Sequence, residues 1–435
     1  MKEICFEKKI PIAGEYDVVV VGGGPAGWIA AVAAARSGAR TAVIERYGFF
    51  GGAATTSLVV PISGMFKNGE RVVGGIPWEF ISRMTEMDAA QLEMPKGNIS
   101  VDPEIYKLIA QRMLIEAGVT LYTNSYLSDC MTDGESVRAV RIENKSGSCA
   151  ISGKVFIDAT GDGDLCDLAG VPMMPADDFL QPMSMCFVLT GVDVTTPLLR
   201  DCIHHDGKGG RGSCNTEIRN YLKGLHADGR IPDFGGPWFN TLLLDDRIAV
   251  NITRSQAVAY DAASVTAAEI RMREDMFAIV EALREHYPEF KNAVISFSAA
   301  QGGIREGRHI MGDFLLTEND LLNAVHFEDS IARNSHPVDI HIPGSTAQTL
   351  KKVDRSGYIP YRTMTVPGFD DLIAAGRMIC ADRGAHASIR VQATVMAIGQ
   401  AAGIAASIAA AEDKSVREIS ISGLQEKLSD MGGIF

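Results

Sequence analysis

No Cys-x-x-Cys pair occurs among the eight cysteines of this 435-residue chain, so nothing supports an iron–sulfur cluster or a redox-active dithiol. Four residues of metal-binding type, Cys202, His204, His205 and Cys214, do lie within thirteen residues. Their spacing matches no standard zinc motif and the segment reads as a loop, although the residue types would suit zinc. We therefore predict no metal site, while the sequence leaves open whether these four bind one. Scattered cysteines are typical of reduced thiols in a cytoplasmic protein.

An excess of positive charge is also lacking. The chain has 41 Lys and Arg against 54 Asp and Glu, a net charge of −13, which argues against nucleic acid as a main partner. The first residues, MKEICFEKKIPIAGEYD, lack the apolar core and the cleavage site of a signal peptide. The most apolar late stretch, Val391 to Ala411, is dominated by Ala and Gly and contains Thr394, Gln400 and Ser407. It predicts a buried, tightly packed helix rather than a membrane span.

The composition is that of a globular α/β protein, with 46% apolar residues and 44 glycines. Its length allows two domains, or one domain with a large insertion. A helix is expected over residues 102–118, because Asp102 suits the N-cap and Pro103 the first helical position. Residues 267–285 predict a second helix with charged flanks.

The most informative segment is residues 16–45, YDVVVVGGGPAGWIAAVAAARSGARTAVIE. Val18 to Val21 are apolar on both faces, as a buried parallel strand requires. Gly22, Gly24 and Gly27 then give the spacing G-x-G-x-x-G, which permits a tight turn, close approach of a pyrophosphate, and close helix–strand packing. Pro25 suits the start of the following helix, whose N-terminal amides would face the phosphates.

An acidic residue completes this pattern. A second strand, residues 42–44, leads to Glu45, which lies 23 residues after Gly22, where a carboxylate accepts from an adenosine ribose hydroxyl. A glycine-rich turn without a ligand would explain the glycines alone, but strand, turn, helix, strand and acid together predict a dinucleotide site. No second glycine fingerprint for NAD(P) is evident.

Two later segments extend the pattern: Phe156–Leu165, FIDATGDGDL, and Leu372–Ala406, LIAAGRMICADRGAHASIRVQATVMAIGQAAGIAA. Together with residues 16–56 they resemble the FAD-dependent oxidoreductases of the glutathione-reductase-like superfamily, and more narrowly the bacterial FAD-dependent oxidoreductase family. The segments GIREGRHIMGDFLLTENDL and PVDIHIPG also match that family's pattern. The resemblance covers most of the chain and is weakest across residues 195–290.

The resemblance implies an α/β fold: a Rossmann-like FAD-binding domain with a central parallel sheet, helices on both sides and a small antiparallel crossover sheet. It also implies an inserted α+β substrate domain. The expected boundaries are residues 1–172 for the first part of the FAD-binding domain, 173–355 for the substrate domain and 356–435 for the C-terminal part of the FAD-binding domain.

FAD is the cofactor that the resemblance implies. The first glycines would hold the pyrophosphate, Glu45 the ribose, the Leu127 backbone the adenine, and the later segments would close over the nucleotide. Asp158 and Asp162 are equally explained as turn and cap residues. The full set of expected cofactor-binding residues is Gly22, Gly24, Pro25, Ala26, Gly27, Glu45, Arg46, Gly51, Gly52, Ala53, Leu127, Ala159, Thr160, Gly161, Gly376 and Asp382.

Four residues are candidates for catalysis: His386, Arg390, Arg305 and Arg308. His386 precedes the C-terminal helix that would point at the flavin, and imidazole titrates in a useful range. The arginines could bind a carboxylate bidentately. The competing interpretations are a histidine hydrogen-bonded in a turn and arginines in a structural ion-pair network.

The sequence therefore predicts an FAD-dependent oxidoreductase that transfers hydride between flavin N5 and a small organic substrate, in a direction that stays open. One alternative is fumarate-reductase-like reduction of an activated C=C bond, for which the arginines would favour an anionic substrate. The other is an FAD-holding electron-transfer subunit of a larger complex. A homo-oligomer is compatible with the sequence; nucleic acid and a membrane span are not expected.

Overall fold

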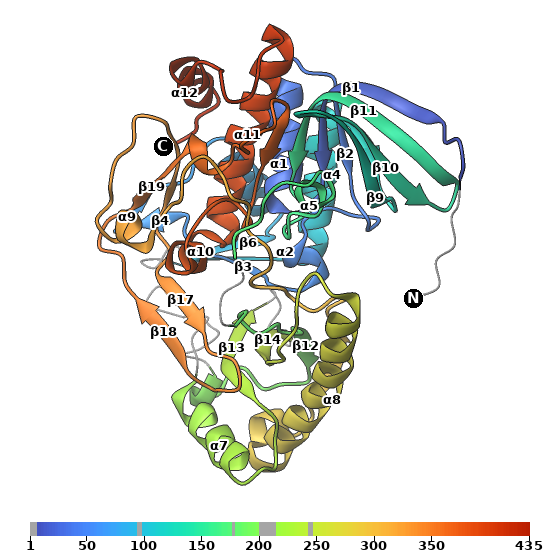
Figure 1. Ribbon diagram of the computed structural model, residues 1–435. Helices are drawn as coiled ribbons and strands as arrows, with labels where there is room; N and C mark the ends of the chain where they lie inside the picture. Colours follow the sequence, from blue (N-terminus) through green and yellow to red (C-terminus); the bar gives the residue numbers. More distant parts are fainter. Residues whose placement is uncertain (1–6, 94–97, 176–178, 200–214, 242–246) are drawn as a thin grey trace.

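The computed structural model describes residues 7–93, 98–175, 179–199, 215–241 and 247–435, and the Cys202–Cys214 segment lies outside these ranges. Figure 1 shows a larger part built around a central sheet and a smaller part that holds helices α7 and α8. The smaller part is formed by residues from the middle of the chain, as an insertion would be.

The central sheet has seven strands in the order β8-β2-β1-β11-β10-β9, and β20 also pairs with β11. The strands β8, β2, β1, β11 and β20 run parallel to one another, whereas β10 is antiparallel to both of its neighbours, β11 and β9. Because parallel strands end at one edge, the residues that follow β1, β2, β11 and β20 meet there, which is where such sheets bind ligands. The bounds are β1 Ile12–Val21, β2 Thr41–Ile44, β8 Thr120–Tyr122, β9 Tyr126–Asp133, β10 Ser136–Asn144, β11 Gly147–Asp158 and β20 Leu372–Ala374.

Helices α1 (Pro25–Arg36) and α11 (Gln392–Glu412) cover one face of this sheet. They pack almost backbone to backbone: a Cβ on Gly399 would lie 2.2 Å from the carbonyl oxygen of Ala26, and one on Gly403 would lie 2.1 Å from that of Ala30. From the first contact to the second, each helix advances by four residues. The two helices therefore run in the same direction, and their N-termini lie at the same end of the sheet.

The other face of the sheet is covered by side chains of the antiparallel strands and of one short helix. Alternate side chains of β1, Val19 and Val21, pack there with Val140 and Ile142 of β10 and with the short helix α5 (Asp164–Leu168). The antiparallel strands that follow β8 thus supply much of this cover, in the place expected for the crossover sheet.

Several shorter elements surround the central sheet. Helix α4 begins one residue after Asp102, whose carboxylate accepts from the amides of Glu104 and Ile105, as the N-cap pattern predicted. The remaining bounds in the larger part are α2 Ala53–Thr56, α3 Ile76–Glu86, α4 Pro103–Glu116, α9 Glu318–Leu322, α10 Arg383–Ile389, α12 Ile421–Asp430, β3 Pro61–Ile62, β4 Phe66–Lys67, β5 Glu70–Arg71, β6 Ala90–Glu93, β7 Asn98–Val101, β16 Ser330–Asn334, β17 Val338–His341, β18 Gln348–Lys351 and β19 Gly357–Pro360.

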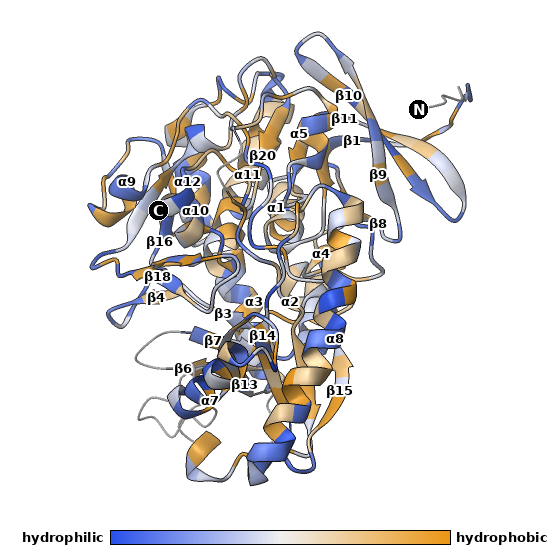
Figure 2. Ribbon diagram, turned by 60° about the horizontal axis from the view of Figure 1, so that its bottom comes forward, coloured by the Kyte–Doolittle hydropathy of each residue, from blue (hydrophilic) through white to orange (hydrophobic). Residues whose placement is uncertain are grey.

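The smaller part is an antiparallel sheet of order β13-β14-β12-β15 with α7 and α8. Helix α8 is amphipathic (Figure 2), and its buried Met276, Ile279 and Leu283 pack in one cluster with side chains of the sheet. Strand β16 lies inside the expected insert 173–355 but pairs with β19, so the boundaries stay a prediction. The bounds are α7 Thr216–Ala227, α8 Ala262–His286, β12 Phe187–Thr190, β13 Phe234–Thr241, β14 Arg247–Thr253 and β15 Val294–Ser298.

One helix in the described part of the chain, α11, is long and apolar enough to cross a membrane by length and composition. However, 94% of its apolar window is buried inside the structure, against α1 and the sheet. This is the environment of a core helix, as the Ala- and Gly-rich sequence predicted.

We predict that Gly403→Ala destabilises the protein, because the added Cβ would collide with the Ala30 carbonyl of α1. Overpacking of this kind costs roughly 1–3 kcal/mol, and thermal unfolding followed by circular dichroism should show a lower melting temperature. Gly224→Ala is the matched control, since a Cβ at Gly224 of α7 meets nothing within 4 Å. That change should leave stability equal or raise it by up to about 1 kcal/mol; equal effects of both substitutions would contradict the close packing.

Candidate functional site

The first glycine turn connects β1 to α1 and has no room for side chains. Gly22 has a φ of 100°, and a Cβ there would lie 2.4 Å from the carbonyl oxygen of Ala159. A Cβ on Gly27 would lie 1.8 Å from the carbonyl oxygen of Gly22, so the third glycine is what lets α1 approach the strand. Pro25 and Ala26 form the first turn of α1, which has no side-chain cap.

A second pair of glycines lies against this turn. The amide of Gly51 donates to the carbonyl of Gly23 at 2.9 Å. Gly52, with a φ of 50°, precedes Ala53 of α2, and its Cβ would lie 2.8 Å from Cα of Gly24. Backbone therefore meets backbone at the uncapped positive end of α1, a suitable surface for the pyrophosphate of a dinucleotide.

Glu45 follows β2 and is only 7% exposed. Its Oε2 accepts from the amide of Gly23 at 2.7 Å and its Oε1 accepts from the amide of Tyr47 at 2.9 Å. Burial raises the pKa of Glu45, and these amides partly oppose the rise. A carboxylate fixed to the glycine turn has acceptor capacity left for a ribose hydroxyl.

Two further residues expected to bind the cofactor, Arg46 and Leu127, also lie near Glu45. Arg46 Nη2 donates to Oε1 of Gln301 at 2.6 Å. Leu127 lies on β9 opposite Ile142, two residues after Ser125, whose amide donates to the Glu45 carbonyl at 3.0 Å. This places Leu127 beside the end of β2, on the side expected for the adenine.

The second and third motifs meet beside the first. Ala159, directly after β11, donates its amide to the Val21 carbonyl at 2.8 Å, and Asp158 accepts from the amide and hydroxyl of Thr160 at 3.0 and 2.7 Å. Asp158 thereby has the turn role that was one of its two interpretations. Nearby, Gly161 and Gly376 have φ values of 90° and 120°.

An ion pair joins these two motifs: Arg377 Nη2 lies 2.8 Å from Oδ1 of Asp162. A Cβ on Gly161 would meet the same guanidinium at 2.7 Å. Asp382 is the N-cap of α10, where its Oδ1 accepts from Ala385 at 2.8 Å and from Glu318 at 3.0 Å. Its carboxylate is thus held by backbone amides, and a contact with FAD stays a prediction.

Arginines from three separate segments converge near the N-terminus of α11. Arg254 follows β14, Arg305 lies in the 302–309 segment, and Arg390 is the C-cap of α10. Burial and the neighbouring charges of Arg254 and Arg390 hold the pKa of Arg305 well below its ordinary value. Burial likewise lowers the pKa of Arg254 to about 10.

Asp339 of β17 is the carboxylate that pairs with this group. Its Oδ2 lies 3.7 Å from Arg390 Nη2 and 3.2 Å from His341 Nε2. Burial alone would raise the pKa of Asp339, but His341 and Arg390 lower it below its ordinary value. Burial, together with Arg305, lowers the pKa of His341 to about 3, so that this imidazole is neutral.

Arg308 lies in a different environment from Arg305. Its guanidinium contacts Asp167 at 2.7 Å and Asp164 at 3.6 Å, and it stacks over Tyr260 at 4.8 Å. The structure thus brings Arg305 and Arg390 together and places Arg308 in the ion-pair network that was its competing interpretation.

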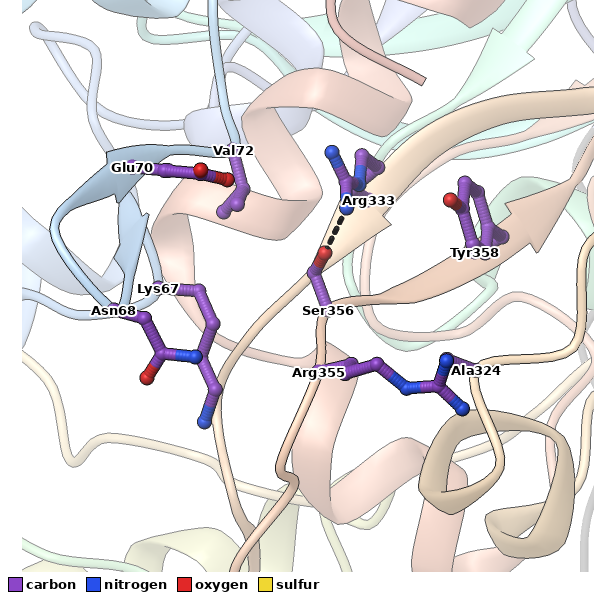
Figure 3. Close-up of a pocket in the computed structure, with 9 residues that line it drawn as sticks. All are labelled: Lys67, Asn68, Glu70, Val72, Ala324, Arg333, Arg355, Ser356 and Tyr358. Atoms are coloured by element: carbon purple, nitrogen blue, oxygen red, sulfur yellow. Dashed lines mark hydrogen bonds between the residues drawn. The ribbon is translucent and has the colours of Figure 1, made fainter.

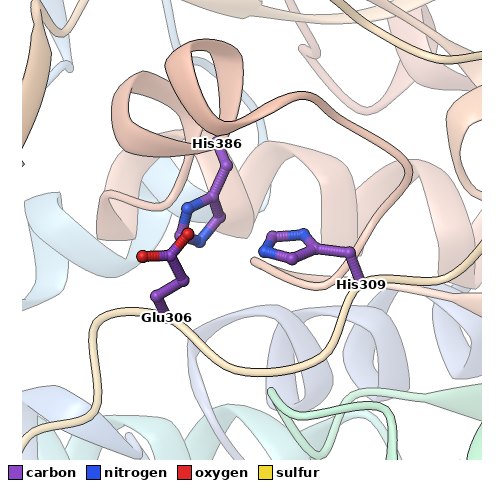
Figure 4. Close-up of side chains that lie close together, drawn as sticks. All are labelled: Glu306, His309 and His386. Carbon is purple, nitrogen blue, oxygen red and sulfur yellow. The ribbon is translucent and has the colours of Figure 1, made fainter. Parts of the chain in front are cut away.

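His386 is fully buried on α10 beside His309 and Glu306 (Figure 4). The two imidazole rings meet edge to face with centroids 4.4 Å apart. Neither ring nitrogen of His386 has a hydrogen-bond partner in the described structure. Burial, followed by the charges of His309 and Arg390, lowers the pKa of His386 well below its usual range.

A separate cavity of about 300 Å³ opens between β4, β5 and β16 (Figure 3). Lys67, Arg333 and Arg355 line it together with Glu70 and Tyr358, and none of these was among the expected site residues. The Arg333 guanidinium donates to the Ser356 hydroxyl inside this cavity.

Sequence reasoning missed Arg254 altogether and gave Asp339 no role. The only signal for Arg254 was an arginine that ends an apolar strand, in RIAVNITR. Glu306 and His309 stood in the noted GIREGRHI segment, but nothing local showed that this segment would reach α10.

A model of the FAD dependent oxidoreductase family matches residues 17–428. Dihydrolipoyl dehydrogenase of Trypanosoma brucei brucei is 53% identical over 47 residues, or 11% of this chain and 10% of that protein. Digeranylgeranylglycerophospholipid reductase 2 of Methanopyrus kandleri is 29% identical over 197 residues, or 41% of this chain and 46% of that protein. The matched regions therefore span less than half of the length of either relative.

Among solved structures, a geranylgeranyl bacteriochlorophyll reductase-like protein of Thermoplasma acidophilum aligns with a TM-score of 0.50 at 14% identity. The alignment covers 97% of this chain and 84% of that one. At this identity the likeness concerns the fold alone, and it confirms the expected α/β, Rossmann-like class.

We predict that Glu45→Gln weakens FAD binding about tenfold, since hydrogen bonds to a charged group contribute roughly 1.5–3 kcal/mol. Fluorescence titration of the apoprotein with FAD would measure the dissociation constant. Glu143→Gln, at a carboxylate on β10 that pairs with Arg141, is the control and should bind FAD as the unaltered protein does. Unchanged affinity of the Glu45 variant would exclude a ribose contact.

Proposed function

Because the chain belongs to the family of FAD-dependent oxidoreductases, we propose that it transfers hydride between FAD and a small organic anion. The family match confirms FAD as the cofactor and an oxidoreductase as the class of enzyme. When bound, FAD supplies flavin N5 as the hydride donor or acceptor. Everything else must come from the side chains around it: binding, orientation, exclusion of water and charge compensation.

The observation that supports an anionic substrate is the convergence of Arg254, Arg305 and Arg390. Within the described ranges, neither Arg254 nor Arg305 forms an ion pair, and Arg390 forms one with Asp339 at 3.7 Å. Arg254 Nη2 and Arg390 Nε are also buried without a hydrogen-bond partner. Such groups are costly to leave unpaired, and a carboxylate or phosphate of the substrate would satisfy them.

Burial makes this attraction strong. Arg254 is 4% exposed, and in a region of low dielectric constant two opposite charges interact far more strongly than in water. Planar guanidinium groups also orient a carboxylate, because they bind it through two parallel hydrogen bonds. The arginines would therefore fix both the position and the direction of the substrate.

Backbone amides add to this environment. Helix α11 begins two residues after Arg390, and its N-cap Val391 provides no side-chain cap. The positive ends of α11 and α1 lie at one end of the sheet and favour negative charge there. Negative charge that develops on the cofactor or substrate would be stabilised by groups that are already in place.

Reduction of an activated C=C bond is the second candidate. Two observations favour it: the arginines suit an unsaturated acid, and the Methanopyrus kandleri relative is named as a reductase. A substrate screen would distinguish the two directions. A substrate that is reduced would reoxidise dithionite-reduced flavin, whereas a substrate that is oxidised would bleach oxidised flavin.

A cytoplasmic location is part of the proposal. It is supported by the cysteines in the described ranges, which are free thiols, as is usual in a reducing compartment. They are Cys130, Cys149, Cys166, Cys186 and Cys380.

We expect Arg305→Met to raise KM for an anionic substrate at least tenfold, because one half-buried positive charge is lost while a long apolar stem remains. The measurement is an anaerobic screen of mono- and dicarboxylates for flavin bleaching or reoxidation, followed by steady-state kinetics on the best one. Arg417→Met is the control: Arg417 pairs with Asp313 on the surface, and its loss should leave KM unchanged.

A KM for carboxylates that is equal in the Arg305 variant and the unaltered protein would contradict the anionic substrate. Uncharged analogues provide an internal comparison, since their turnover should respond far less to this substitution.

A further inference from the structure

A cluster of three potential metal ligands lies between α10 and the 302–309 segment. His386 projects from α10, and Glu306 and His309 project toward it from the facing segment (Figure 4). One ligand atom from each residue lies within 4.8 Å of the other two. Glu306 and His386 are both buried, at 2% and 0% exposure.

His386 is the most unusual member of this group. Both of its ring nitrogens are buried without a hydrogen-bond partner. Buried polar atoms in folded proteins nearly always have a partner, so an orphaned imidazole points to a group that binds it. A neutral imidazole presents a nitrogen lone pair, which is the form that a metal ion binds.

The other two residues are held as metal ligands usually are. His309 Nδ1 lies 3.5 Å from the carbonyl oxygen of Ile379. Glu306 Oε2 accepts from the amide of Gln181 at 2.8 Å, which fixes the orientation of its carboxylate. Backbone groups thus orient both side chains from the outer side.

We propose that Glu306, His309 and His386 bind one divalent first-row transition metal ion, such as Zn²⁺ or Fe²⁺. Two imidazoles and one carboxylate form a ligand set that these ions accept, with further positions left for water or substrate. Metal–ligand distances of about 2.0–2.2 Å place ligand atoms roughly 3–3.5 Å apart, so small side-chain movements would close the site. The sequence had suggested no metal here, because its three ligands come from two distant segments.

The surrounding charges restrict which ions fit. Arg383 Nε lies 3.5 Å from Glu306 Oε1, and Arg377 and Arg390 act on His386 through their charges. A hard cation such as Mg²⁺ prefers several oxygen ligands, and this group offers a single carboxylate in basic surroundings. The nitrogen-binding transition metals are therefore the class that the residues favour.

This inference is independent of the proposed function, because it concerns metal binding rather than turnover. A different partner for His386, a polar atom of the bound cofactor or substrate, is the principal alternative. Metal content distinguishes the two, whereas activity alone would not.

The test is the metal content of the FAD-loaded protein. The protein is stripped with a chelator, dialysed against Zn²⁺ or, anaerobically, against Fe²⁺, desalted, and analysed by mass spectrometry for metal per FAD. We expect about one equivalent in the unaltered protein and at least a fivefold loss in His386→Asn. Glu306→Gln keeps the side-chain shape and should show the same loss even if the histidine variant fails to fold.

Two controls address other binding sites. His326→Gln removes an exposed histidine elsewhere and should retain the metal. The double variant Cys202→Ser, Cys214→Ser tests the metal-capable segment found in the sequence, and it should also retain the metal. Arg305→Met, which tests the proposed substrate site, should leave metal content unchanged, so that failure of either hypothesis can be recognised separately.

Three results would overturn the site: less than about a tenth of an equivalent in the unaltered protein, full retention in Glu306→Gln, or loss in the cysteine double variant. X-ray absorption at the zinc edge gives an independent readout, because two imidazole ligands produce a characteristic outer-shell signal that the histidine variants should lack.

Discussion

The contact between α1 and α11 determines where the cofactor-facing groups lie. Gly399 and Gly403 let the two helices approach until a single methyl group would collide with the Ala26 and Ala30 carbonyls. Because the helices are parallel, both N-termini lie at the carboxyl edge of the central sheet, and neither has a side-chain cap. Two partial positive charges are thereby fixed side by side by packing alone. The last long helix of the chain thus completes a site that its first fifty residues begin.

The rest of this edge is assembled by backbone rather than by side chains. Gly22 lies against Ala159, the Gly51 amide donates to the Gly23 carbonyl, and Gly52 lies against Gly24. Close backbone contacts tolerate little displacement, so a ligand would find amides and helix ends already in position. Glu45 is the exception, and its carboxylate is itself tied to this backbone through the Gly23 amide. The close backbone contacts therefore account both for the rigidity of this edge and for the polar backbone groups that it exposes.

The cofactor side of the molecule was predictable because its signals are local. Strand, glycine turn and helix follow one another within residues 16–36, and Asp102 with Pro103 predicted the start of α4 correctly. Arg305 and Arg390 were named as candidates, but their grouping with Arg254 and Asp339 was not predictable, because these four residues are separated by up to 136 residues and meet only when the smaller part packs on the larger one. Arg308 shows the same limit: it stands three residues from Arg305, yet it pairs with Asp164 and Asp167 of α5. Sequence proximity could not separate the two arginines, whereas tertiary packing did.

The segment of residues 302–309 contacts both the cofactor edge of the sheet and the group of buried arginines. Gly307 can have no side chain because its Cβ would lie 1.9 Å from Asp162 Oδ1, and Asp162 in turn pairs with Arg377 of the third motif. The segment therefore packs closely against the cofactor edge of the sheet. The residues before and after Gly307 project away from this contact in different directions. Arg305 reaches the buried arginines, Glu306 and His309 reach His386, and Arg308 reaches α5. A change in the packing at Gly307 would thus alter the buried arginine group and the histidine cluster together, which makes this short loop the structural link between the cofactor edge and the proposed substrate site.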